Sequence, residues 1–81
     1  MKKTVIQRMN AIIRMMEMGG ISVRGITTKT NEKTFVIGCG RKTVCMSLDM
    51  MLAIGDGVRY LDETTMSEII DLNEESFIPM L

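Results

Sequence analysis

The spacing of apolar residues in this chain changes from a helical to a strand period at Gly19-Gly20, and this change restricts the folds that the chain can adopt. Before the glycine pair, apolar side chains recur every three or four positions: Val5, Met9, Ile12 and Met16. This spacing predicts an amphipathic helix over residues 2–18, ended by glycines that tolerate a left-handed C-cap. After the pair, apolar residues alternate with polar ones and β-branched residues are frequent. The chain is therefore expected to begin with a helix and to continue into a sheet.

Three strands are predicted after the glycine pair, over residues 21–28, 34–39 and 43–48. The polar run 29–33 is typical of a hairpin loop, and the glycine-containing basic stretch 38–42 marks a second tight turn. Both connections are too short for a crossover helix, so the strands are expected to form an antiparallel meander.

The pattern is weaker beyond residue 48. Asp49 can cap a short helix over 50–54, and the Gly-Asp-Gly sequence at 55–57 then turns the chain into a last strand over 58–61. The same Gly-Asp-Gly sequence could instead join two strands in a hairpin. We favour the short helix followed by a turn and a strand.

A capping-box spacing from Thr65 to Glu68 predicts a further helix over residues 66–73, and an apolar tail follows at 77–81. The predicted fold class is α+β: a small antiparallel β-meander of three to four strands packed on the N-terminal amphipathic helix, with a short C-terminal helix. A chain of 81 residues, 46% of them apolar, is expected to form a single domain over 1–81. The first helix covers one face of this sheet, and the sequence assigns no cover to the other.

The formal net charge of zero is the sum of two oppositely charged halves. Residues 1–42 hold nine of the ten Lys and Arg and two of the ten acids, whereas the remainder holds Arg59 and eight acids, so the halves carry +7 and −7. Charge asymmetry points to charged partners and to electrostatic steering, and carries no information about fold.

The chain has no histidine, which removes much catalytic and metal chemistry. Ser-His-Asp and Cys-His nucleophile systems and the common Cys/His zinc sites cannot be assembled from it. We therefore expect no enzyme activity, no cofactor and no metal site. The apolar runs are far shorter than the roughly 20 residues that span a bilayer, and Gln7, Arg8 and Asn10 interrupt the first of them. A cytoplasmic protein without a membrane span or export signal is expected.

Two features near the second turn could carry chemistry. Cys39 and Cys45 flank it symmetrically and could face each other across the hairpin, as structural thiols or as a redox switch. Reduced, structural thiols fit a reducing cytoplasm better. The stretch from Gly38 to Thr43 resembles a phosphate-binding loop, but it lacks a glycine before Lys42 and a strand follows it rather than a helix. We interpret it as a hairpin turn with solvated basic residues.

Acidic side chains gather near the C-terminus and are the candidate partner-binding residues: Asp62, Glu63, Glu68, Asp71, Glu74 and Glu75. They could also form a solvated face, which helix dipoles and solubility favour, or paired carboxylates for catalysis or metal binding. An alternative nucleic-acid face would use basic residues of the first half: Arg8, Arg14, Lys29, Arg41 and Lys42. The chain lacks the stacking aromatics and the helix-turn-helix pattern that such proteins usually carry.

Methionine is unusually frequent, and its flexible thioether suits both irregular cores and adaptable interfaces. Eight methionines could serve either role: Met9, Met15, Met16, Met18, Met46, Met50, Met51 and Met66. We expect most to fill the core and some to reach the surface.

These features predict a small non-enzymatic protein-interaction module. In this hypothesis the acidic C-terminal half docks on a basic surface of a target protein, and Met-rich apolar surface supplies contact area. Its small size suggests, by association alone, an inhibitor or adaptor of bacterial or phage type. The alternatives are a nucleic-acid-binding accessory protein that uses the basic half, and a homo-oligomer, such as a homodimer, in which opposite halves meet.

Overall fold

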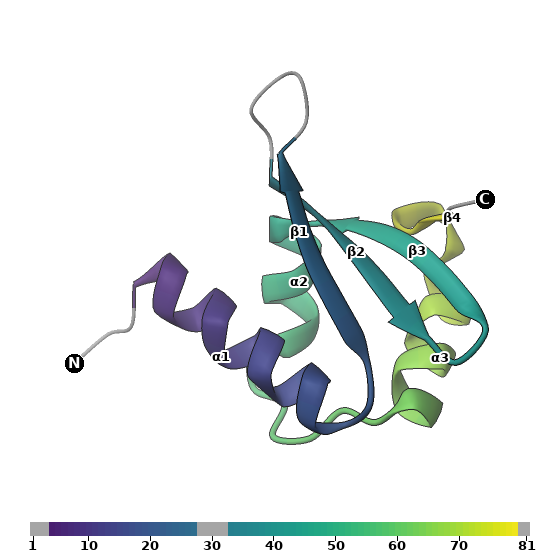
Figure 1. Ribbon diagram of the computed structural model, residues 1–81, viewed down its shortest axis with the longest axis horizontal. Helices are drawn as coiled ribbons and strands as arrows, with labels where there is room; N and C mark the ends of the chain where they lie inside the picture. Colours follow the sequence, from purple (N-terminus) through teal and green to yellow (C-terminus); the bar gives the residue numbers. More distant parts are fainter. Residues whose placement is uncertain (1–3, 28–32, 80–81) are drawn as a thin grey trace.

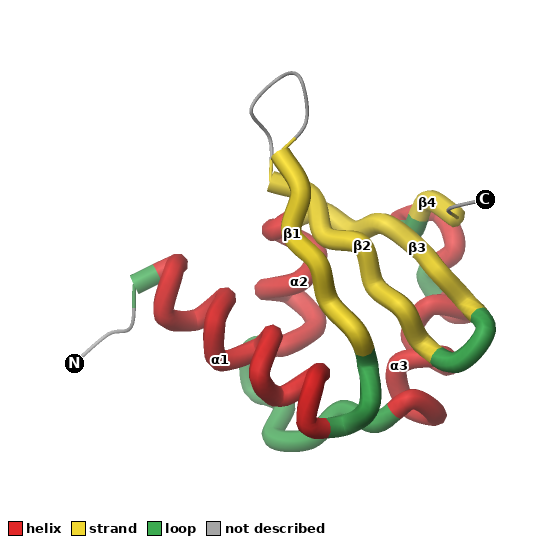
Figure 2. The backbone as a smooth tube through the Cα atoms, viewed as in Figure 1, coloured by secondary structure: helices red, strands yellow, loops and turns green. Residues whose placement is uncertain are grey.

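The protein folds as an antiparallel sheet with helices packed on one face (Figures 1 and 2). The computed structural model describes residues 4–27 and 33–79. Its elements in chain order are α1 (Val5–Met18), β1 (Ser22–Thr27), β2 (Lys33–Cys39), β3 (Lys42–Ser47), α2 (Leu48–Gly55), α3 (Glu63–Leu72), the short 3₁₀ helix η1 (Glu74–Ser76) and β4 (Ile78–Pro79). This confirms the predicted α+β class, with a β-meander, an N-terminal helix and a short C-terminal helix.

Helix α1 begins three residues later than predicted, because its start is fixed by a capping box. The Thr4 hydroxyl accepts a hydrogen bond from the Gln7 backbone N–H, and the Gln7 side chain accepts one from the Thr4 backbone N–H. At the other end Gly20 has a φ of 88°, the left-handed conformation that the glycine pair predicted. The N-terminal helix is thus confirmed, and the predicted hairpin loop at 29–33 lies largely outside the described residues.

The register of the meander decides which side chains enter the core. Phe35, Ile37 and Cys39 of β2 alternate toward the helices, and β3 contributes Val44 and Met46 opposite them. The helices complete the core with buried residues at helical spacing: Ile12 and Met16 of α1, Met51 of α2, and Met66 and Ile70 of α3. Four methionines are buried, and Met9, Met15 and Met50 pack against the core with partial burial, so most of the eight candidates contribute to it.

The other face of the sheet has no helix packed on it among the described residues (Figure 2). One cross-strand row on this face runs from Arg24 through Val36 and Cys45 to Ile78. Since Cys39 pairs with Lys42 and Cys45 with Val36, the two cysteines lie on opposite faces. The prediction that they could face each other across the hairpin is wrong.

The last strand predicted over residues 58–61 is also wrong. Ile78 and Pro79 take its place beside β3, pairing with Cys45 and Val44. Residues 58–60 instead run past α1, where Val58 is 38% and Tyr60 66% exposed, while Leu61 is fully buried. The short helix favoured for this region is confirmed as α2, and it excludes the alternative hairpin around residues 55–57.

Both later helices use a different cap from the predicted one. Ser47, not Asp49, caps α2, because its hydroxyl accepts the Met50 N–H at 3.1 Å. Helix α3 starts at Glu63, because the Asp62 carboxylate accepts the Thr65 N–H at 2.8 Å. The predicted capping box beginning at Thr65 therefore lies inside the helix rather than at its start.

Candidate functional site

The predicted acidic residues occupy α3, its cap and η1, and two of them have structural partners. Asp62 caps α3, and the hydrogen bond from the Thr65 backbone lowers the pKa of this carboxyl. Asp71 accepts a hydrogen bond from the Lys42 ammonium at 2.5 Å, and the same ammonium donates to the Ser67 hydroxyl. These two acids are therefore already engaged within the chain.

Three of the other acids lie close in the chain to an exposed leucine, whereas Glu63 is exposed at the opposite end of α3. Glu68 and Leu72 are four residues apart on α3 and so share one helical face, pointing away from the buried Met66 and Ile70. Leu72 is 83% exposed, and the exposed Glu74 and Glu75 of η1 follow it after Asn73. We call this group the acidic docking surface: Glu68, Leu72, Glu74 and Glu75. Sequence analysis missed Leu72, although its spacing of two from Ile70 takes it out of phase with the core positions.

The candidate basic residues fall into two groups rather than one stripe. Arg8 and Arg14 belong to α1. Arg41, in the turn that joins β2 to β3, and Lys42, the first residue of β3, lie beside α3 (Figure 1). Lys29 lies outside the described residues. Arg8 forms an ion pair with Asp56 through two hydrogen bonds, which raise the pKa of its guanidinium, and Lys42 pairs with Asp71. Two of these cations are thus bound to acids of the other half of the chain.

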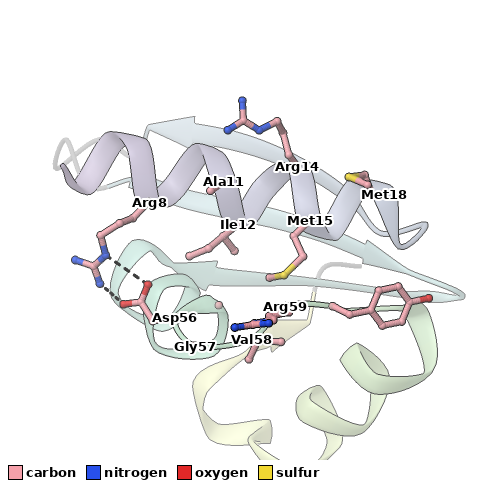
Figure 3. A pocket seen from close by; sticks show the side chains of 12 residues that line it. Arg8, Ala11, Ile12, Arg14, Met15, Met18, Asp56, Gly57, Val58 and Arg59 are labelled. Atoms are coloured by element: carbon pink, nitrogen blue, oxygen red, sulfur yellow. Dashed lines mark hydrogen bonds and ion pairs between the residues drawn. The ribbon is translucent and has the colours of Figure 1, made fainter. Parts of the chain in front are cut away.

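A groove of about 610 Å³ lies between α1 and residues 55–60. Ile12 and Met15 of α1 point into it, toward Val58 and Arg59 of the facing segment (Figure 3). Further residues line its length and rim: Arg8, Ala11, Arg14, Met18, Gly55, Asp56, Gly57 and Tyr60. Sequence analysis did not identify this groove, because it assigned residues 58–61 to a strand.

Neither thiol has the surroundings of a reactive cysteine. Cys39 is buried in the core and its Sγ donates to the Glu63 carbonyl oxygen at 3.1 Å. Burial, followed by the charge of Glu63, raises the pKa of this thiol, which disfavours the nucleophilic thiolate. Cys45 is buried on the other face of the sheet, 8% exposed. The geometry therefore favours two structural thiols.

Comparisons with known proteins give no indication of the function. No family model, no curated protein and no solved structure matches the chain. None of the helices in residues 4–27 and 33–79 combines the length and the apolar character needed to cross a bilayer. In the same residues no three His, Cys, Asp or Glu side chains converge as metal ligands would.

Proposed function

We propose that this protein is a small non-enzymatic interaction module, an inhibitor or adaptor, that docks on a basic surface of a target protein. The observation that carries the proposal is Leu72, which is 83% exposed, one helical turn after the exposed Glu68 and shortly before the exposed Glu74 and Glu75. Protein interfaces commonly combine a desolvated apolar centre with a polar rim. The acidic docking surface has both parts on one helix and the 3₁₀ turn that follows it.

The acids and the leucine would act at different stages of binding. Complementary charges steer the encounter and set its salt dependence, whereas the apolar contact is desolvated in the complex and slows dissociation. Leu72 would enter an apolar socket on the target, and the carboxylates would meet Lys or Arg around that socket. The proposal places the protein in the cytoplasm, where its two free thiols stay reduced.

The test is site-specific photo-crosslinking in a nuclease-treated lysate of the source cells. A photoreactive residue at position 72 should capture a protein target, and one at the exposed Glu17 of α1 should not. Combining the position-72 probe with Glu68→Gln, Glu74→Gln and Glu75→Gln should weaken capture by about tenfold, because rim charges mainly raise the association rate.

Two outcomes would overturn the proposal. Equal capture from positions 72 and 17 would mean that the acidic docking surface is not the contact. Material that is recovered only without nuclease would favour the alternative function, nucleic-acid binding through the basic half.

A further inference from the structure

Close packing at two glycines creates the groove between α1 and residues 55–60. Gly55 lies against the Ile12 side chain, with no room for a Cβ, and Gly19 lies against the Leu61 carbonyl in the same way. Between these two contacts the chain turns at Gly57, whose φ is 82°, and passes α1 without a strand partner. Helix α1 and residues 55–61 are therefore in close contact near both ends of the groove and are separated between these contacts.

The floor of the groove is apolar and adaptable. Ala11, Ile12 and Met15 line it from α1, and Val58 lines it from the facing segment (Figure 3). Met18 extends the apolar surface at the end of α1 and is 88% exposed. Methionine side chains repack readily around different apolar groups, so this floor can receive a branched or aromatic side chain.

The rim of the groove carries net positive charge. Its acid, Asp56, is paired with Arg8, which leaves Arg14 and Arg59 without an ion-pair partner among the described residues. Arg59 lies on the segment that faces α1, whereas the Arg14 side chain points away from that segment and must turn about its flexible stem to reach a ligand in the groove (Figure 3). Arg59 is the single basic residue of the acidic half, and the turn at residues 55–57 brings it to the basic helix. Guanidinium groups bind carboxylates through two parallel hydrogen bonds, so this rim suits carboxylate side chains.

We propose that this groove is a second binding site, which takes an acidic peptide segment of a partner protein with an apolar side chain between its acids. The apolar side chain enters the floor at Met15 and Val58, and the flanking carboxylates bind Arg14 and Arg59. A single-stranded nucleic acid would match the charge but not the floor, because its bases stack on aromatic rings and Tyr60 is the one aromatic residue in the lining. With the acidic docking surface, the groove would let one chain bind two partners of opposite charge.

The test is fluorescence anisotropy with short synthetic peptides. One peptide carries Leu or Phe between Asp and Glu residues, the second replaces the apolar residue by Ser, and the third probe is an oligothymidylate. The first peptide should bind at least about tenfold more tightly than the other two, a difference of about 1.4 kcal/mol. Arg14→Gln with Arg59→Gln should weaken its binding by about tenfold or more. The matched control is Arg24→Gln, an exposed arginine of β1 outside the groove, which should leave binding unchanged.

Methionine methyl resonances locate the bound peptide without any mutation. The Met15 and Met18 signals should shift on titration, whereas that of Met46, which is buried in the core away from the groove, should not. Leu72→Ala should leave peptide binding intact, so that failure of the acidic docking surface and failure of the groove are distinguishable.

Four results would overturn the proposal. They are equal affinity for the Leu and Ser peptides, equal affinity of the wild type and the arginine variant, tighter binding of the oligothymidylate, and absence of peptide binding. A fifth result would change the occupant of the groove. If sedimentation velocity shows a homodimer that dissociates in Arg14→Gln with Arg59→Gln, the groove binds the acidic docking surface of a second copy rather than a peptide.

Discussion

Gly19 and Gly55 hold α1 against the rest of the chain because they have no side chain. A Cβ on Gly19 would lie 1.7 Å from the Leu61 carbonyl oxygen, and one on Gly55 would lie 2.4 Å from Ile12 Cγ1. Gly19 has an ordinary φ of −86°, so its requirement is space rather than backbone freedom. These contacts set the distance between α1 and residues 55–61, and with it the width of the groove.

The substitution Gly19→Ala should therefore be strongly destabilising. The obstructing atom belongs to the backbone and cannot rotate away, so α1 must move, at a cost of about 3 kcal/mol or more. Gly57→Ala is the matched control, because a Cβ there meets no atom and only the φ of 82° is strained, at about 1–2 kcal/mol. Urea unfolding followed by circular dichroism measures both. A Gly19→Ala protein as stable as Gly57→Ala would show that the Leu61 contact is absent.

At the scale of elements, local patterns predicted most of the fold. Helix α1 and the three strands of the meander follow from periods of three to four and of two, which depend on neighbours in sequence. The segment 58–61 was assigned to a strand because the Gly-Asp-Gly sequence before it suits a turn. What decides its structure is distant in sequence: Ile78 and Pro79 occupy the edge of β3 where such a strand would pair.

The candidate sites were less predictable, because they depend on which charges meet in space. The sequence identified the acids and bases but not the pairing of Arg8 with Asp56, which are 48 positions apart. The sequence also did not show that α1 and residues 55–60 face each other across a groove, because the turn at Gly57 is what brings Arg59 to α1. Leu72 had a local signal, its offset from the helical period of Met66 and Ile70.

The carboxylate of Asp62, which caps α3, makes the stability of the protein pH-dependent in the acidic range. The pKa of Asp62 is lower in the folded protein than its ordinary value of 3.8, so its contribution is fully present above that value. The contribution is lost as the pH falls below 3.8 through the folded pKa, because the unfolded state then binds the proton more readily. Asp62→Asn keeps a capping oxygen that does not titrate, and is the matched control.

We therefore expect the stability of the wild type relative to Asp62→Asn to be constant at neutral pH and to decline below about pH 4. Thermal unfolding of both proteins across this range measures the difference, and a carboxyl NMR titration gives the pKa directly. A difference that stays constant down to the lowest pH, or an Asp62 pKa at or above 3.8, would contradict the role assigned to this cap.

At the scale of the whole molecule, folding leaves the charged halves largely unpaired with each other. Two ion pairs link them among the described residues, Arg8 with Asp56 and Lys42 with Asp71, and all four side chains are at least one-third exposed. Three exposed acids, Glu68, Glu74 and Glu75, belong to the acidic docking surface, while Arg14 and Arg59 line the groove. The fold thus keeps the dipolar charge on its surface, where it can act on partners.

Stability and binding should consequently respond differently to salt. Exposed ion pairs contribute little to stability, and the core of Met, Ile, Val, Leu and Phe residues is not screened by ions. We expect the urea midpoint to change little between about 20 mM and about 500 mM sodium chloride, whereas both proposed binding reactions weaken steeply. Arg8→Gln with Lys42→Gln should likewise shift the midpoint only slightly. A large loss of stability in salt or in this variant would mean that the two halves stabilise the fold by pairing, and would leave less of their charge for partners.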